Sequence, residues 1–188
     1  MFNPWRSYKM WRHGRGFGVH SPLAYHLIKN VVRDRYACYY YEEAATEVIR
    51  HLKRHDVRVA YRLVSARSPQ SVVLVCDNPG HVTAWLTVIS SIVSENCRVT
   101  VYSGVELDDA DMTIIDADKI PGLPVSRPHS NKGNWTITLG LNRHLRRQSW
   151  NAVVQAPGYN AMTIDSRAGV ALTVRRHNLP RQTILTRL

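Results

Sequence analysis

Two residues of this chain carry side chains suited to proton transfer at positions where a fold could expose them. Asp116 closes the apolar segment DMTIIDA at 111–117, and a carboxylate at a strand end could orient a substrate or accept a proton. His20 lies in the glycine-rich segment HGRGFGVH at 13–20, where an imidazole could act as a general base. Asp116 and His20 are therefore the candidate catalytic residues. A turn-capping carboxylate and a loop histidine bonded to backbone would explain them without catalysis.

The segment VVLVCDNPGHVTAW at 72–85 reads as a strand, a tight turn and a helix. Nucleotide-binding folds keep a glycine-rich loop at such a turn, yet Gly80 is its only glycine. Asn78 and Pro79 predict a capped helix start. Cys76 precedes that helix, and a helix N-terminus lowers the pKa of a thiol. Because the sequence places no histidine beside Cys76, it does not indicate a nucleophile.

The elements that must position these residues follow from the apolar pattern. Ser21-Pro22 starts a helix whose apolar face has helical spacing, at Ala24, Leu27, Ile28, Val31 and Val32. Further helices are predicted from about residue 42, over 57–66, after Asn78, and over 142–155. Residues 1–20 mix aromatic, arginine and glycine residues without a period, which predicts an ordered but irregular arm.

Short β-branched runs predict buried strands at 71–76, 98–102, 111–117 and 135–140. A hairpin and a third extended piece after Pro180 follow. Helices, then strand–helix alternation, then a hairpin predict an α/β sandwich with a mostly parallel sheet. We expect residues 1–67 to form an N-terminal arm with helices, in one compact unit with a sheet domain at 68–188.

The net charge of +11 is divided unevenly along the chain. Residues 1–67 have 13 Lys/Arg against 5 Asp/Glu, residues 68–126 have 2 against 8, and residues 127–188 have 10 against 1. Arginine is well suited to pairing with phosphate or carboxylate. The two basic ends therefore leave open a nucleic acid or an acidic protein as partner.

Cysteine content and hydropathy bear on the compartment. Cys38, Cys76 and Cys97 are odd in number and lack metal-ligand spacing. The first residues do not resemble a signal peptide, and no stretch approaches the roughly 18 apolar residues of a membrane span. These features predict a reduced, cytoplasmic protein with no membrane partner.

HGRGFGVHSP at 13–22 and YYYEEAATEVIR at 39–50 resemble the signature GxGxHSP, then YYxYEE, of a family of uncharacterised bacterial class I S-adenosylmethionine-dependent methyltransferases. DMTIIDAD at 111–118 and the segment 145–176 are similar to later parts of that family. The resemblance implies a Rossmann-like sheet that ends in a reversed hairpin, with S-adenosylmethionine as cofactor. It assigns the cofactor side to Asp77, Gly80, Tyr102 and Asp116.

The chain departs from the family where the cofactor would bind. With Gly80 at the second glycine of the loop, Leu74 stands at the expected acid and Cys76 at the first glycine. Asp77 is the neighbouring substitute for the acid. Tyr102 stands where the family has a carboxylate for the ribose hydroxyls.

The connection after the second strand is also short. Eight residues separate Tyr102 from Asp111, whereas a helical crossover needs about a dozen or more, so a crossover is missing. In metal-dependent relatives acidic ligands follow two strands. Here Asp116 and Asp118 follow one, and WTITLGLNRH offers no carboxylate after the next. We therefore predict no metal site.

Two functions follow from these patterns. The first is a methyltransferase-like protein, active or with a degenerate cofactor site, whose methyl acceptor the sequence does not identify. An active form would place an acceptor in line with the sulfonium methyl, with His20 or Asp116 as base. The second is a non-catalytic binding module whose arginine-rich ends contact nucleic acid or an acidic partner.

Overall fold

The computed structural model describes the chain at residues 4–14, 21–32, 54–104, 110–118, 133–156, 161–166, 169–176 and 181–186. His20 and the helix predicted from residue 42 lie outside these ranges. The fold below therefore concerns the sheet, the helices that cover it and the strand ends.

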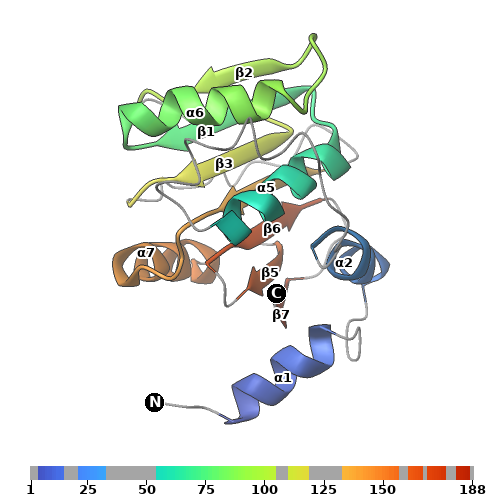
Figure 1. The fold of residues 1–188 in the computed structure, drawn as a ribbon. Helices are drawn as coiled ribbons and strands as arrows, with labels where there is room; N and C mark the ends of the chain where they lie inside the picture. The colour runs from blue at the N-terminus through green and yellow to red at the C-terminus, as the bar shows by residue number, and fades with distance from the viewer. Residues whose placement is uncertain are drawn as a thin grey trace.

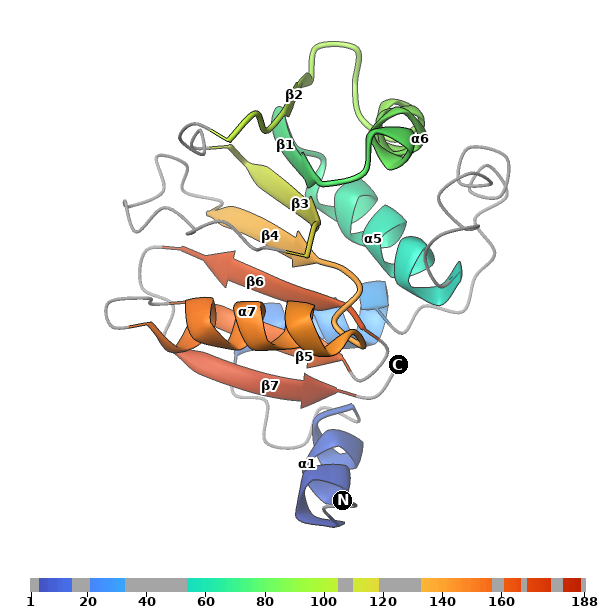
Figure 2. The same cartoon turned by 90° about the vertical axis from the view of Figure 1, so that its left-hand side faces the viewer.

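Seven strands form one sheet in the order β2-β1-β3-β4-β6-β5-β7 (Figure 1 and Figure 2). Their bounds are β1 Ser71–Cys76, β2 Arg98–Val101, β3 Met112–Asp116, β4 Asn134–Thr138, β5 Met162–Ser166, β6 Ala171–Arg175 and β7 Gln182–Thr186. All neighbouring pairs are parallel except the two that involve β6. The predicted hairpin is present as β5 and β6, and the third extended piece is β7, which pairs in parallel with β5.

Helices cover both faces of this sheet (Figure 2). Their bounds are α1 Pro4–Gly14, α2 Pro22–His26, the π-helix η1 Leu27–Val32, α5 Arg54–Arg67, α6 Pro79–Ser90 and α7 His144–Gln155. One apolar cluster joins α2, η1, α5 and α6 to the sheet, and a second joins α7 to its other face. Alternate residues of β1 divide between the two, with Leu74 in the first and Val73 and Val75 in the second.

The architecture is the predicted Rossmann-like fold with a mostly parallel sheet and an N-terminal helical extension. β6 lies between β4 and β5, which reverses the terminal hairpin. β1 is flanked by β2 on one side and by β3 on the other. β2 ends at Val101 and β3 begins at Met112, so ten residues connect them, fewer than the dozen or more of a helical crossover.

The helix that starts at Ser21 is confirmed. The Ser21 hydroxyl accepts the Ala24 N–H at 3.3 Å, and all five predicted apolar residues are buried across α2 and η1. The helix predicted over 57–66 is present as α5, and the one predicted over 142–155 is present as α7. α5 buries an apolar stripe at helical spacing, which is the pattern that sequence reveals best, whereas the buried residues of α7 are Arg146 and Trp150.

Two expectations were wrong. The first residues were expected to be irregular, but residues 4–14 form α1, which lies against β7. Its aromatic side chains Trp5, Tyr8 and Trp11 face solvent, so they do not form the inward apolar stripe that would have indicated a helix. β2 was expected to be buried, but it is an edge strand in the described sheet and most of its residues are exposed. None of the helices in the described ranges is long and apolar enough to cross a membrane.

Candidate functional site

A pocket of about 410 Å³ lies at the carboxyl ends of the parallel strands. The turn after β1, the end of β3 and the segment from β4 into α7 supply its walls. The lining residues are Asp77, Asn78, Pro79, His81, Asp116, Asp118, Arg143 and Arg146. Ligands of open α/β sheets bind at the carboxyl ends of the strands, at the point where the strand order reverses. Here the order reverses at β1, which lies between β2 and β3.

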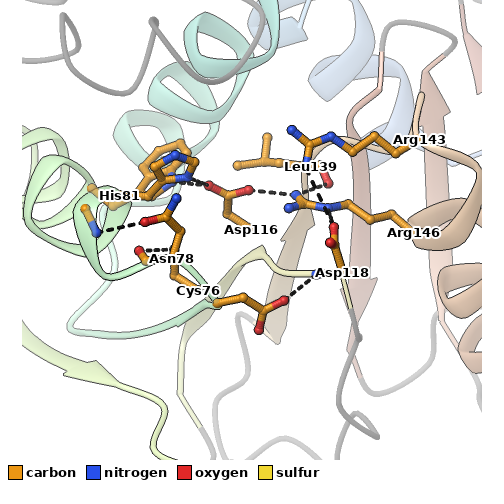
Figure 3. A network of polar contacts seen from close by, with 11 residues as sticks. Cys76, Asn78, His81, Asp116, Asp118, Leu139, Arg143 and Arg146 are labelled. Atoms are coloured by element: carbon orange, nitrogen blue, oxygen red, sulfur yellow. Dashed lines mark hydrogen bonds and ion pairs between the residues drawn. The ribbon is translucent and has the colours of Figure 1, made fainter.

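Asp116 is the centre of the polar contacts in the pocket (Figure 3). Its side chain is fully buried, and three side chains from two helices bond to it. Arg146 of α7 donates to Oδ1 at 2.6 Å, Trp85 of α6 donates to Oδ2 at 3.0 Å, and Nδ1 of His81 lies 3.1 Å from Oδ2. Both carboxylate oxygens therefore have protein partners.

Hydrogen bonds and a neighbouring charge hold the pKa of this carboxylate below its usual range. Burial alone would raise the pKa of Asp116, but the hydrogen bonds from Arg146, Trp85 and His81 together with the Arg146 charge lower it overall. For Arg146 burial opposes the charge, while the hydrogen bonds to Asp116 and Asp118 raise its pKa. The two groups form a buried, hydrogen-bonded ion pair at the inner wall of the pocket.

Arg146 reaches this position because the chain before α7 leaves space for it. Its Nη1 also donates to the Leu139 carbonyl at 3.3 Å, and its Nε donates to Asp118 at 2.7 Å. Gly140 has a φ of +69°, and a Cβ there would lie 2.8 Å from Arg146 Nη1. A glycine is therefore required both by the backbone conformation and by the close approach of the guanidinium.

Asp77 connects the turn after β1 to the end of β3. It is exposed, and its Oδ2 accepts the backbone N–H of Asp118. The hydrogen bond from Arg146 is the main reason that the pKa of Asp118 is lowered. These two carboxylates and Arg143, whose side chain is half exposed and 3.7 Å from Asp118, give the pocket mouth both signs of charge.

The turn itself is that of a capped helix. Asn78 Oδ1 accepts the Gly80 N–H at 2.9 Å, and Pro79 is the first residue of α6. A Cβ on Gly80 would meet only Asn78 Oδ1, at 3.3 Å. A side chain at position 80 would therefore block no close backbone contact. The backbone N–H of Gly80 is already bonded to Asn78.

Cys76 differs from its expected chemistry. The prediction was a pKa lowered by the helix N-terminus, but burial raises the pKa of the Cys76 thiol, and the nearby carboxylates raise it further. The thiol donates to the Asn78 carbonyl at 3.4 Å. The structure also places a histidine, His81, near this thiol, which the sequence did not reveal.

The residues assigned from the sequence are distributed as follows. Asp77 and Asp116 line the pocket, while Gly80 and Tyr102 are not among its lining residues. Tyr102 donates its backbone N–H to Leu74 at 2.8 Å and packs against the α7 side of the sheet. His20 lies outside the described residues.

Three contributors to the site were missed. Trp85 is a core residue at 1% exposure, but its ring N–H donates to Asp116. Arg146 lies in the run RHLRR, which was counted only as part of a basic block. His81 lies in α6, just after the turn that follows Cys76, whereas Asp116 ends another strand, so linear spacing does not reveal the group. Cys76, His81 and Asp116 have potential metal-ligating atoms within 4.8 Å of one another.

Comparison with protein-family models and with curated proteins finds no match to this chain. Similar solved structures include the O-methyltransferase from Bacillus cereus in complex with SAH, at 15% identity and a TM-score of 0.42, covering 81% of this chain and 96% of that one. A protein from Klebsiella pneumoniae provisionally assigned as an O-methyltransferase has 13% identity and a TM-score of 0.40, covering 94% and 92%. Because these TM-scores are low, the fold assignment rests on the strand order and pairing described above.

Proposed function

We propose that this chain is a methyltransferase-like protein whose pocket binds a small zwitterionic ligand and does not transfer a methyl group. The observation that carries the proposal is that both carboxylate oxygens of Asp116 are bonded to protein side chains. A general base needs an accessible lone pair and a pKa near the working pH. Asp116 is fully buried, is bonded through both oxygens and has a lowered pKa, so it is a poor general base.

S-adenosylmethionine does not fit the residues present. A nucleoside needs close backbone approach at a glycine turn, and the N–H of Gly80 is already bonded to Asn78. Tyr102 offers no carboxylate to ribose hydroxyls. We therefore derive no methyl-transfer step for this chain.

An amino-acid-sized zwitterion has complementary partners. Asp77 supplies a carboxylate for an ammonium group, and Arg143 supplies a guanidinium for a carboxylate. The volume of about 410 Å³ suits a small molecule, since ligand pockets span about 300–1,000 Å³. Two exposed groups of opposite charge in one pocket favour a ligand that also carries both signs.

The test compares L-methionine with S-adenosylhomocysteine (SAH) by calorimetry and thermal shift on the full chain. We expect L-methionine to stabilise the protein at millimolar concentration, and SAH to bind no more than about tenfold tighter, or about 1.4 kcal/mol, because adenosine adds few contacts. Arg143→Ala and Asp77→Asn should remove the stabilisation. Arg176→Ala, which removes an exposed arginine elsewhere, should retain it.

Two results would overturn the proposal. One is SAH binding more than about 100-fold tighter than L-methionine, or about 2.7 kcal/mol, which would indicate a working cofactor site. The other is no stabilisation by either compound at millimolar concentration. Transfer of a labelled methyl group from S-adenosylmethionine to any acceptor would exclude the non-catalytic part.

A second candidate function, single-stranded nucleic acid binding, is favoured by the outer face of α1. Trp5, Tyr8 and Trp11 are 64%, 48% and 47% exposed, with neighbouring ring centroids 5.9 and 6.3 Å apart. Lys9 lies 5.6 Å over Trp5, and Arg12 lies 5.8 Å over Tyr8. Bases stack on such rings and phosphates pair with such cations.

Filter binding of a labelled single-stranded oligonucleotide over a salt series tests this candidate. We expect affinity to fall as salt rises and Trp11→Ala to weaken binding by about 5- to 150-fold, as for loss of one stacked base. Tyr25→Ala is the matched control, because Tyr25 is also exposed beside a lysine but lies outside α1. Affinity independent of salt, or an equal loss in the control, would exclude the α1 face as the binding surface.

A further inference from the structure

Three side chains with different ligand atoms converge at the inner end of the pocket. Cys76 ends β1, His81 lies in the first turn of α6, and Asp116 ends β3 (Figure 3). Cys76 and Asp116 are register partners on adjacent parallel strands. A sulfur, a nitrogen and an oxygen from the three residues all lie within 4.8 Å of one another. The fold itself therefore holds the three ligand types together.

The spacing of the nitrogen and the oxygen fits a tetrahedral ion. His81 Nδ1 and Asp116 Oδ2 are 3.1 Å apart. Zinc bonds of about 2.0–2.1 Å at a tetrahedral angle separate nitrogen and oxygen ligands by about 3.3 Å. The metal would replace the proton now shared by Nδ1 and Oδ2, with the imidazole proton carried on Nε2. Cys76 would be the third ligand, after its thiol loses its proton to solvent and rotates away from the Asn78 carbonyl.

The surrounding groups prepare Asp116 for this role. Arg146 bonds Oδ1, so Oδ2 is the oxygen that faces His81. Trp85 also holds Oδ2 and fixes the carboxylate plane. Outer hydrogen bonds of this kind orient metal ligands in proteins.

The charge and the open space around the group also suit a cation. The pocket is lined by the carboxylates of Asp77, Asp116 and Asp118 against the guanidiniums of Arg143 and Arg146. Thiolate formation at Cys76 adds a further negative charge. His81 and Asp116 belong both to the ligand group and to the pocket wall, so an ion held by them would border the pocket.

We propose that Cys76, His81 and Asp116 bind one divalent ion of the zinc class, with three protein ligands and an open fourth position. The donor set selects the ion, since mixed thiolate, imidazole and carboxylate ligands suit zinc better than magnesium or calcium. The site goes beyond the zwitterion pocket proposed above and does not depend on it.

Cobalt substitution tests the site in the full chain without a histidine tag. We expect Co²⁺ to bind with a stoichiometry of one and to give a sulfur-to-cobalt charge-transfer band with the intense visible absorption of tetrahedral cobalt. Added Zn²⁺ should displace it. Cys76→Ser should abolish the charge-transfer band, and His81→Gln should weaken Co²⁺ binding by more than about 100-fold, beyond the cost of losing an outer-shell partner.

The matched control is Cys38→Ser/Cys97→Ser, which leaves Cys76 as the remaining cysteine and should keep the band and the affinity. Far-UV circular dichroism of each variant establishes that it is folded, and Asp116 variants are avoided because they strand Arg146. A band that persists in Cys76→Ser, that disappears in the double control, or that never forms at millimolar Co²⁺ would overturn the proposal. Methionine and SAH binding is measured on metal-free protein, so failure of either proposal is separable from the other.

Discussion

Strand β3 carries a buried arginine–aspartate pair at each of its two ends, and the two pairs differ in their surroundings. At the amino end, Arg67 bonds Asp111 at 2.8 Å. The other oxygen of Asp111 accepts the backbone N–H of Gln70, and Arg67 also bonds the Gly133 carbonyl. These partners join α5 to the loops before β1, β3 and β4, and none of them lines the pocket.

At the carboxyl end, Arg146 and Asp116 form a shorter and more deeply buried pair. Two side chains of α6, not backbone groups, complete the contacts of the carboxylate, and α6 and α7 cover opposite faces of the sheet. The pair borders open space, a thiol and a histidine. The same type of ion pair therefore joins structural elements at one end of β3 and forms the wall of a pocket at the other end.

The largest expected effect is that of Asp116→Ala on stability. We expect a loss of about 3–5 kcal/mol in the free energy of unfolding, because the change removes the buried partner of Arg146 and leaves the exposed Asp118 as its remaining carboxylate. Urea denaturation measures the loss. The double variant Asp116→Ala/Arg146→Met should recover most of it, since no buried charge is stranded. A loss below about 1 kcal/mol in the single variant would contradict a desolvated ion pair.

Acid should act on the same pair with a smaller effect, because protonation removes the charge but keeps the side chain. The folded-state pKa of Asp116 is lowered, so its contribution is complete above the unfolded value of about 3.9 and is lost as pH falls through the folded value. The charged and titratable groups around it are Arg146, Asp118, His81 and the Cys76 thiol. Urea midpoints from pH 6 to 2 should fall less steeply below about pH 4 in Asp116→Asn than in the natural chain. Equal slopes would mean that Asp116 is not the titrating group.

Asp111→Ala should cost less than Asp116→Ala, about 1–3 kcal/mol. Asp111 is 17% exposed, and Arg67 keeps its bond to the Gly133 carbonyl after the change. The variant should also leave Co²⁺ and methionine binding unchanged. If Asp111→Ala is the more destabilising of the two, the contrast between the ends of β3 is wrong.

Asp118→Asn gives the smallest expected effect. Asp118 contacts Arg146 but is 63% exposed, so solvent screens the pair and the free energy of unfolding should change by about 0–1 kcal/mol. Thermal and urea midpoints are the measurement. A cost comparable with that of Asp116→Ala would show that the pocket mouth, and not its inner wall, holds the pair together.

The fold could be predicted because its signals are local. The Ser21 cap, the run SVVLVC and the Asn78-Pro79 turn each specify an element through neighbouring residues. α1 was missed because its aromatic side chains face solvent. β2 was misjudged because the sequence of a strand does not reveal whether another strand will cover its edge.

The site could be predicted only in part. Asp116 was found because a carboxylate at a strand end is visible in the sequence. Its partners His81 and Arg146 come from positions 35 and 30 residues away and meet it only through the sheet order. Gly140 was not assigned a role because the guanidinium that it accommodates is a tertiary contact.

The contrast between the two ends of β3 is tested most directly by nitrogen–proton spectra of the arginine side chains, assigned with Arg146→Lys and Arg67→Lys. The chain is titrated with L-methionine and separately with Zn²⁺. We predict that the Nε–H signal of Arg146 moves saturably with at least one of the two ligands while that of Arg67 stays in place. An unmoved Arg146 signal with both ligands, or equal movement of the Arg67 signal, would contradict a ligand site at the carboxyl end of β3.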